Sequence, residues 1–76
     1  MSKNLAVLRR ALGISQTDMA KVIGLGLTSY NLKENGKSDF NQEQMVKLRD
    51  FFIKQGFNVS IEELFFNKKV INPITA

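Results

Sequence analysis

The stretch SQTDMAKVIGLGLTSYNLKENGK, residues 15–37, decides the fold of this chain. It places two short amphipathic segments close together, with glycines between them. Ser15 is a good helix N-cap, and Asp18 follows three residues later in a capping-box arrangement. Apolar or small residues then mark one buried stripe, at Met19, Ala20 and Ile23. The pattern predicts a short helix that begins after Ser15 and ends at Gly24.

The second segment of this stretch predicts another helix that crosses the first. Leu25 enters the core, and the helix continues through Tyr30 to its end near residues 35–36. Ala20 and Gly24 are small, so we expect them to permit a tight crossing of the two helices. A side chain at Gly24 is expected to obstruct the approach of the second helix.

The remaining helices are indicated by apolar spacing and by caps. Leucines recur at helical spacing near the start, at Leu5, Leu8 and Leu12, behind Ser2 or Asn4 as possible caps and before a stop at Gly13. Asn41 with Gln44 forms a capping pair that opens the longest helix, with apolar positions at Met45, Leu48, Phe51 and Phe52 and an end at Gly56. Ser60 with Glu63 opens a short last helix through Leu64 and Phe65. The sequence predicts a compact all-α, five-helix domain.

The domain organisation follows from where the helix signals stop. Residues 1–66 contain all five predicted helices, whereas residues 67–76 contain Pro73 and show no helical period. We expect one helical domain followed by a C-terminal tail. Its core is expected to consist of ten apolar residues: Leu5, Leu8, Leu12, Met19, Ile23, Leu25, Met45, Leu48, Phe51 and Leu64.

Composition argues against several classes of protein. The chain of 76 residues has no histidine and no cysteine, so the usual general base, the thiolate nucleophile and most zinc sites are absent. The glycines of GLG at residues 24–26 follow no strand and precede no Gly-Lys-Ser/Thr, so they predict no phosphate-binding loop. We expect a protein that is not an enzyme and uses no cofactor or metal. No apolar run suits a membrane span and the start is not a secretory leader, so a cytoplasmic location is expected.

The positive charge is concentrated in the first half of the chain. The formal net charge is +4, and up to Lys37 six basic residues stand against two acidic ones. From Ser38 onward the counts are five and five. The outward side of the second helix of the opening stretch is nearly uncharged, with Lys21, Lys33 and Lys37 around it. A polyanion is therefore an expected partner, and an uncharged ridge between cations suits the major groove of DNA. The alternative is the mild basicity that is common among small soluble proteins.

The opening stretch resembles the helix-turn-helix of the phage lambda-type repressor and Cro family. The matching features are Gln16 at the start of the first helix, Ala20, Gly24 in the turn, Leu25, and ENG followed by a lysine at residues 34–37. The resemblance extends from LRRALGIS at residues 8–15 to VSIEELF at residues 59–65, about four fifths of the chain. It implies a five-helix DNA-binding domain over residues 1–66, with a recognition helix at about residues 27–35 that enters the major groove of double-stranded DNA.

The resemblance also assigns roles to individual residues. Gln16, at the amino end of the first motif helix, is expected to bind a phosphate. Leu27, Thr28 and Leu32 lie where the family places base contacts, Leu32 being suited to a thymine methyl group. Further expected contacts are Ser29 and Asn31, which flank these positions, and Asn35 and Lys37, which hold the DNA backbone.

Four further residues have expected structural roles. Arg9 and Glu34 correspond to a pair that in relatives links the first helix to the end of the recognition helix. Lys33 departs from the aliphatic residue of many relatives, so its stem is expected to cover the core while its amine points outward. Tyr30 is expected in the core, with a hydroxyl that reaches a phosphate as the alternative.

Affinity of such a domain normally comes from two copies on a two-fold site, so a homodimer that acts in the nucleoid is expected. The chain offers apolar surface for pairing after the last predicted helix, at Phe65, Phe66, Val70, Ile71 and Ile74. The alternative is that this tail covers the core. A small bacterial or prophage repressor or Cro-like regulator fits these features. Two alternatives remain. One is a protein-interaction module of the same fold, such as an antirepressor, a modulator of another regulator protein or an antitoxin. The other is a bare helical bundle.

Overall fold

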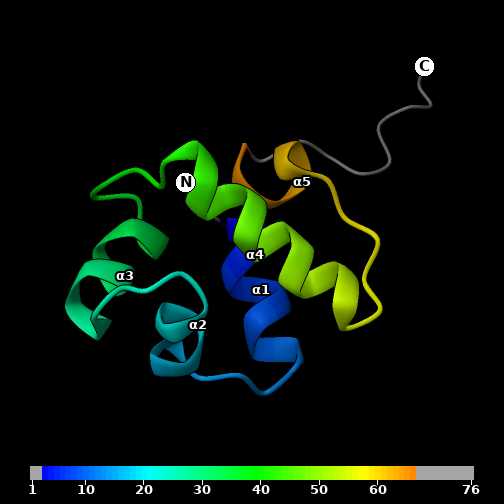
Figure 1. The fold of residues 1–76 in the computed structure, drawn as a ribbon, viewed down its shortest axis with the longest axis horizontal. Coiled ribbons are helices and arrows are strands. Elements are labelled where there is room, and N and C mark those ends of the chain that lie inside the picture. The colour runs from blue at the N-terminus through cyan, green and yellow to red at the C-terminus, as the bar shows by residue number, and fades with distance from the viewer. Residues whose placement is uncertain (1–2, 67–76) are drawn as a thin grey trace.

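The structure, a computed structural model, describes residues 3–66 and consists there of helices without strands. The helices are α1 (Lys3–Ala11), α2 (Gln16–Val22), α3 (Leu27–Glu34), α4 (Gln42–Lys54) and α5 (Ile61–Phe65). Figure 1 shows α4 across the front of the molecule, with α2 and α3 together on one side of it and α5 on the other side. The expected all-α, five-helix fold is confirmed. None of the described helices has the length and apolar character needed to cross a membrane.

The turn between α2 and α3 has the geometry of a Schellman cap. Gly24 has a φ of +72°, and the backbone N–H of Leu25 donates to the carbonyl of Ala20 at 2.9 Å. A Cβ built on Gly24 would meet nothing within 4 Å. The expectation that a side chain there obstructs the next helix is therefore wrong. Glycine is favoured at this position because its backbone adopts the left-handed conformation without a steric penalty.

The predicted capping pairs that open α4 and α5 are confirmed. The Asn41 side chain accepts from the backbone of Gln44, and the Gln44 side chain accepts in return from the backbone N–H of Asn41. Ser60 and Glu63 form the same reciprocal pair. Each box satisfies two N–H groups that a helix start leaves without partners. These two caps fix where the C-terminal helices begin.

The starts of α1 and α2 differ from the sequence-based expectation. At α2 the Ser15 hydroxyl accepts from the backbone of Asp18, but the structure shows no return bond from the Asp18 side chain. At α1 the alternative of Asn4 as the cap is wrong, because Asn4 lies inside the helix. Its side-chain amide donates to the carbonyl of Glu63 and so ties α1 to α5. Ser2, the other proposed cap, lies outside the described residues.

The core is built from all five helices and from two residues between helices, Ile23 and Phe40. Its buried side chains are Leu5, Met19, Ala20, Ile23, Tyr30, Phe40, Leu48, Phe52, Leu64 and Phe65. The other expected core residues are only partly buried and pack against this cluster: Leu8, Leu12, Leu25, Met45 and Phe51. Phe40, between α3 and α4, was not among the expected core residues. Its ring lies 5.9 Å from that of Tyr30 and 5.3 Å from that of Phe65, so it joins α3 to α5.

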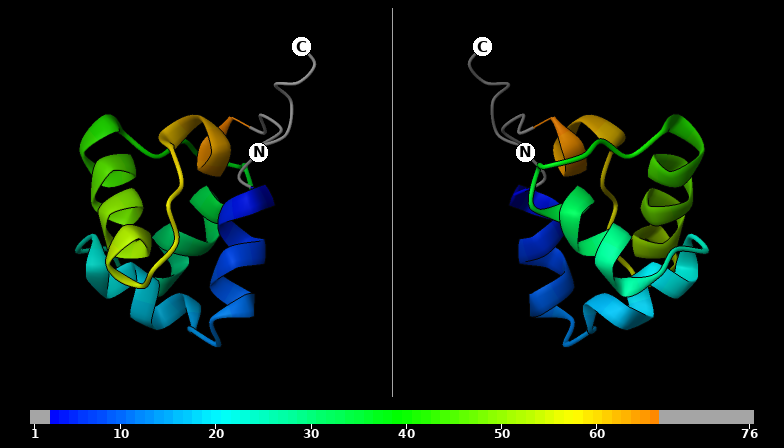
Figure 2. Two further views of the ribbon diagram at one scale, coloured as in Figure 1. Left: turned by 90° about the vertical axis from the view of Figure 1, so that its right-hand side faces the viewer. Right: turned by 90° about the vertical axis from the view of Figure 1, so that its left-hand side faces the viewer.

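The packing leaves one side of α3 uncovered. This helix contacts α2 and α1, and the right-hand view of Figure 2 shows it at the front of the molecule, beside α1. The inward side of α3 carries Tyr30 and Glu34, which are buried. The outward side of α3 is therefore left open at the surface.

Candidate nucleic-acid interface

The outward side of α3 is exposed and carries no charged group. Leu27 and Leu32 retain 48% and 41% of their surface, Thr28 and Ser29 are exposed, and Asn31 is half-buried. Five of the eight residues expected to contact DNA thus lie together on one helix: Leu27, Thr28, Ser29, Asn31 and Leu32.

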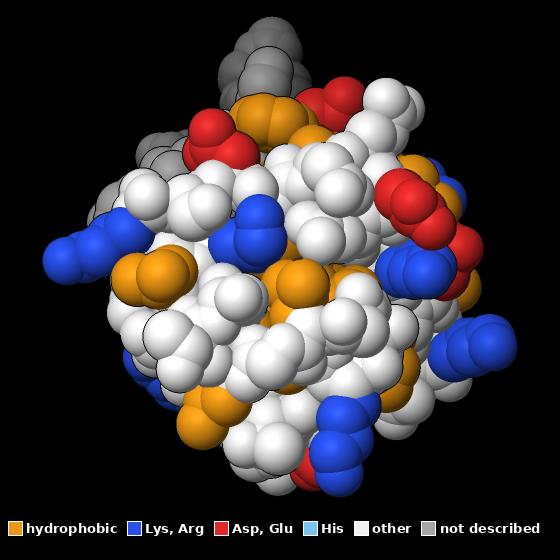
Figure 3. All heavy atoms as spheres, turned by 60° about the vertical axis from the view of Figure 1, so that its left-hand side comes forward, with side chains coloured by type: hydrophobic (Ala, Val, Ile, Leu, Met, Phe, Trp, Pro, Cys, Tyr) orange, Lys and Arg blue, Asp and Glu red, His pale blue; other side chains and the backbone are white. Residues whose placement is uncertain are grey.

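Lysine and arginine side chains surround this ridge. Figure 3 shows the side of the molecule that bears α2 and α3: basic side chains are spread over it between uncharged ones, and acidic side chains lie toward its margins. Lys21 and Lys37 are exposed. This distribution favours an anionic partner, because basic side chains lie on the face and acidic side chains lie at its margins.

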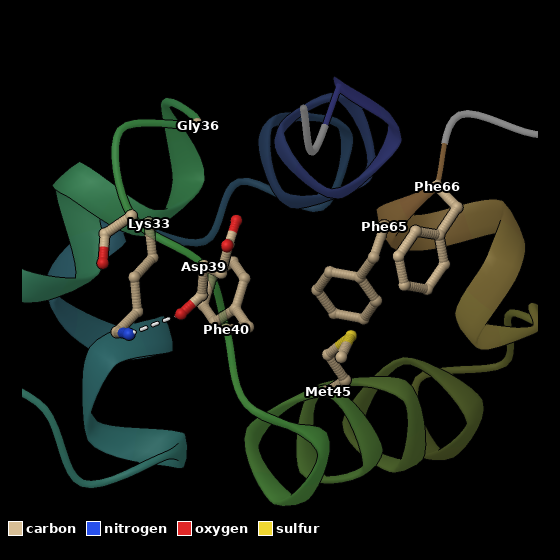
Figure 4. A pocket seen from close by; sticks show the side chains of 8 residues that line it. Lys33, Gly36, Asp39, Phe40, Met45, Phe65 and Phe66 are labelled. Carbon is tan, nitrogen blue, oxygen red and sulfur yellow. Dashed lines mark hydrogen bonds between the residues drawn. The ribbon is translucent and has the colours of Figure 1, made fainter.

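Lys33 lies at one end of this face, next to a cavity of about 340 Å³. Its side chain is half-buried, and its amine donates to the backbone carbonyl of Asp39 at 2.7 Å, as Figure 4 shows. The expected arrangement, with the stem against the body and the amine at the surface, is in keeping with this geometry. The bond to Asp39 holds the amine at the loop between α3 and α4.

The ion pair between Arg9 and Glu34 links α1 to the end of α3, as expected. The Arg9 guanidinium donates to both Glu34 oxygens, from Nε at 2.8 Å and from Nη2 at 3.1 Å, and Nη1 donates to the carbonyl of Ile14 at 2.9 Å. The two side chains are 10% and 2% exposed. This pair removes the one carboxylate of α3 from the outer surface and fixes α3 against α1.

Tyr30 completes the inner contacts of Glu34. The ring is fully buried, which confirms the core assignment, and the hydroxyl donates to Glu34 Oε2 at 2.7 Å. The alternative in which this hydroxyl reaches a phosphate is therefore wrong. Burial would raise the pKa of the Glu34 carboxyl, but the hydrogen bonds from Arg9, Tyr30 and Gln16 outweigh burial and lower that pKa. Burial and the bond to Glu34 raise the pKa of Tyr30 far above its ordinary value.

A chain of side-chain amides runs outward from the same carboxylate. Gln16 Nε2 donates to Glu34 Oε1 at 2.8 Å, Asn31 Nδ2 donates to Gln16 Oε1 at 3.1 Å, and Asn35 Nδ2 donates to Asn31 Oδ1 at 3.1 Å. Gln16 and Asn31 are half-buried and Asn35 is exposed. The structure thus brings together three of the residues expected to contact DNA. Sequence reasoning did not predict this chain, although Asn31 and Asn35 have the spacing of neighbours on a helix.

No group of three or more acidic, histidine or cysteine side chains that could hold a metal ion occurs among residues 3–66.

Lys37, the eighth expected contact, follows the end of α3 and is exposed. Its backbone N–H donates to the carbonyl of Leu32 at 2.9 Å, which closes the helix end.

Known proteins resemble this chain over most of its length. The family model described as helix-turn-helix matches residues 5–64. The chain is 36% identical over 64 residues to the cryptic phage CTXphi transcriptional repressor RstR of Vibrio cholerae. The matched segment covers 84% of this chain and 53% of RstR. It is 32% identical over 74 residues to the antitoxin PezA of Streptococcus pneumoniae, which covers 97% of this chain and 44% of PezA. The chain spans about half the length of these relatives, and no solved structure matches it.

The matched range begins in α1 and ends in α5, so it includes the turn at Gly24 and the exposed side of α3. The chain belongs to the helix-turn-helix family, in its lambda-repressor-like form.

Proposed function

We propose that this protein is a sequence-specific transcriptional regulator, a repressor or Cro-like protein, that binds a double-stranded DNA operator with α3 in the major groove. One observation supports this most directly: the exposed side of α3 is uncharged, because its single carboxylate, Glu34, is buried and paired with Arg9. A helix of this kind approaches the bases without repelling phosphates. Such a regulator acts in the cytoplasm, at the nucleoid.

The proposed contacts fall into two groups. Leu27, Thr28 and Leu32 face the base edges, with Ser29 and Asn31 beside them. Leucine has no hydrogen-bonding group, so Leu32 would contact a thymine methyl, whereas the Thr28 hydroxyl can bind a base edge. Gln16, Asn35 and Lys37 would hold the phosphate backbone on either side of the helix.

The proposed DNA-binding unit is residues 1–66, and the proposed active form is a homodimer. Phe66 supports the second part: it is 58% exposed and lines both the cavity of about 340 Å³ beside Lys33 and one of about 470 Å³ between α4 and α5. An exposed apolar ring at the end of α5 suits a self-complementary two-fold contact. Val70, Ile71 and Ile74, which were also expected to serve pairing, lie outside the described residues, and we propose the tail at residues 67–76 as part of the interface.

Salt dependence tests DNA binding directly. Duplexes selected from a random pool supply the ligand, and fluorescence anisotropy measures their affinity at several salt concentrations. We expect affinity to fall steeply as salt rises, because each neutralised phosphate adds close to one unit to the slope of log affinity against log salt. A flat salt response would contradict a DNA-binding role and favour a protein partner.

Substitutions on α3 test the assignment of the reading helix. Thr28→Ala or Leu32→Ala should relax sequence preference at individual base pairs, each by on the order of 1 kcal/mol or more. Lys37→Ala should weaken binding to all duplexes alike, because a phosphate contact carries no sequence information. If both kinds of substitution left binding unchanged in a folded protein, α3 would not be the reading helix.

A protein-interaction role of the same fold is the second candidate. It is favoured by the match to the antitoxin PezA, which covers 97% of this chain, and by the exposed Leu27 and Leu32, which suit an apolar partner surface. An antirepressor, modulator or antitoxin would bind another regulator or a toxin through this fold. Co-expression with the products of neighbouring genes, followed by size-exclusion chromatography, separates this role from DNA binding.

A further inference from the structure

The exposed side of α3 offers a ligand mainly hydroxyl groups and apolar carbon. Leu27 and Leu32 are 48% and 41% exposed, and Thr28 is exposed one turn before Leu32 on the same side of the helix. Ser29 is exposed and Asn31 is half-buried beside them. The two leucines have no hydrogen-bonding group in their side chains, so they can recognise a base only by contact with carbon.

This side of α3 lacks the groups that most often identify guanine. Guanine is usually recognised by arginine or lysine, which donates to its O6 and N7 atoms. Lys33 is the one basic residue of α3, and its amine donates to the backbone carbonyl of Asp39 at 2.7 Å. The leucines should therefore contribute a large share of the base discrimination by this helix.

A leucine side chain in the major groove can recognise one substituent of a base, the C5 methyl group of a pyrimidine. Thymine carries this methyl, and 5-methylcytosine carries the same group at the same position. On the major-groove edge the two bases differ only at C4, where thymine has an oxygen that accepts and 5-methylcytosine has an amino group that donates. Contact between leucine and the methyl does not sense this difference.

The hydroxyl of Thr28 does not supply the missing distinction. A hydroxyl both donates and accepts, so it can donate to O4 of thymine or accept from N4 of 5-methylcytosine. Unmethylated cytosine instead leaves a gap opposite the leucine, and the lost contacts weaken binding. We expect Leu32 not to close this gap, because Glu34 fastens α3 to Arg9 of α1 two residues later.

We propose that Leu27 and Leu32 read the C5 methyl group of pyrimidines without distinguishing thymine from 5-methylcytosine, so that methylation of a cytosine at these positions strengthens an operator. The inference rests on the proposed DNA-binding function and adds a chemical mark to which binding responds. Burial of one methyl group corresponds to a change in affinity of about fourfold. A two-fold site presents each position twice, so methylation of both half-sites should strengthen binding about sixteenfold for each leucine.

Two comparisons between duplexes isolate the methyl group. In a duplex selected from a random pool by the wild-type chain, each thymine is replaced in turn by deoxyuridine, which removes only the methyl. Where this replacement weakens binding, a cytosine–guanine pair is compared with its 5-methylated form, which adds only the methyl. Fluorescence anisotropy should show a loss of about fourfold in the first comparison and a gain of about fourfold in the second, at the same positions.

Substitution of the leucines tests whether they are the readers. Leu32→Ala should remove most of the methyl dependence at one position of each half-site, and Leu27→Ala should do so at another, because most of the contacting carbon is lost. Val7→Ala is the matched control: Val7 is an exposed apolar residue of α1, and its variant should keep both methyl effects. Circular dichroism melting establishes that each variant is folded.

The outcomes separate this inference from the function on which it rests. It would be overturned if deoxyuridine bound as well as thymine at every position, or if 5-methylcytosine bound no better than cytosine where thymine exceeds deoxyuridine. Methyl effects that survived in both leucine variants would also overturn it, because they would arise from the DNA or from other side chains. A wild-type chain that selected no duplex from the pool would remove the proposed function, and the inference with it.

Discussion

Glu34 holds together side chains from three helices. It accepts hydrogen bonds from Arg9 of α1, Gln16 of α2 and Tyr30 of its own helix. A carboxylate with this many donors is well stabilised, and loss of one partner leaves buried polar groups unpaired. The proposed interface and the stability of the domain therefore involve the same residue.

Glu34→Gln should lower the free energy of unfolding by about 3 to 5 kcal/mol, because it leaves the Arg9 guanidinium buried without its counter-charge. Urea denaturation followed by circular dichroism measures the change. Glu43→Gln is the matched control: Glu43 pairs with Lys47 on the surface of α4, with the carboxylate side chain 76% exposed. Its loss should cost less than about 1 kcal/mol. Equal losses in the two variants would contradict the role of burial.

The lowered pKa of Glu34 makes stability depend on acid. The pKa of the Glu34 carboxyl is lower in the folded protein than its unfolded value of 4.5. Its ionised form therefore stabilises the fold fully above pH 4.5, and this stabilisation is lost as pH falls through the folded pKa. We expect the Glu34 carboxyl signal in NMR to titrate below pH 4.5 and the free energy of unfolding to decline over the same range. A Glu34 carboxyl that titrates above pH 4.5 in the folded protein would refute this.

Tyr30 provides a separate measurement at alkaline pH, since the chain has one tyrosine and no tryptophan. The pKa of Tyr30 is raised, so its contribution to stability is complete below its ordinary value of 10.0 and is lost as pH rises through the folded pKa. Tyrosinate absorbance should therefore appear only together with loss of helix by circular dichroism. Ionisation with a midpoint near 10 in a helical protein would show that the hydroxyl is not buried.

At the scale of helices, the local signals for caps and stops predicted most of the fold. Asn41 with Gln44 and Ser60 with Glu63 place the starts of α4 and α5, because a capping box involves residues only three apart. The reason given for Gly24 was wrong: the backbone requires the glycine, and the adjacent helix leaves space beside it. Spacing in the sequence shows that a turn occurs but does not show how closely two helices approach.

The position of the candidate site was predictable from the sequence, but the hydrogen bonds between its side chains were not. The exposed side of α3 follows from helical periodicity, so Leu27, Thr28 and Leu32 lie outward as expected. The bonds of Gln16 to Asn31 and Glu34 join residues 15 and 18 positions apart, and they depend on how α2 packs on α3. Phe40 was missed for the same reason, because it lies between helices and is buried by tertiary contacts alone.

The turn between α2 and α3 supplies a prediction at this scale. Gly24→Ala should lower the free energy of unfolding by about 1 to 2 kcal/mol, because alanine is strained at a φ of +72° although its Cβ has space. Gly24→Asn should cost less, since asparagine enters the left-handed region more readily. Thermal and urea denaturation of both variants measure the difference. A larger loss in the asparagine variant would indicate a steric cause after all.

The proposals use two surfaces of residues 3–66, the ridge of α3 and the end of α5 around Phe66, and the cavity beside Lys33 lies between them. If the second surface joins two copies, Phe66→Glu should shift the protein to monomers, because a buried charge without a partner opposes association. Sedimentation equilibrium measures the oligomeric state, and operator affinity should fall with it. Ile53→Glu is the control, since Ile53 is an exposed apolar residue of α4 outside both cavities. A wild-type chain that stays monomeric on its operator would contradict the proposed dimer.

The ion pair between Arg9 and Glu34 has a consequence for the duplex itself. Because two guanidinium nitrogens, Nε and Nη2, fasten α3 to α1, we expect α3 to have little freedom to tilt and follow irregularities of the groove. The DNA must then deform to fit the helix, and the energy needed to deform DNA differs between base steps. We expect operators to contain pliant pyrimidine–purine steps at positions that no side chain touches, and stiff A-tracts placed there to be rejected.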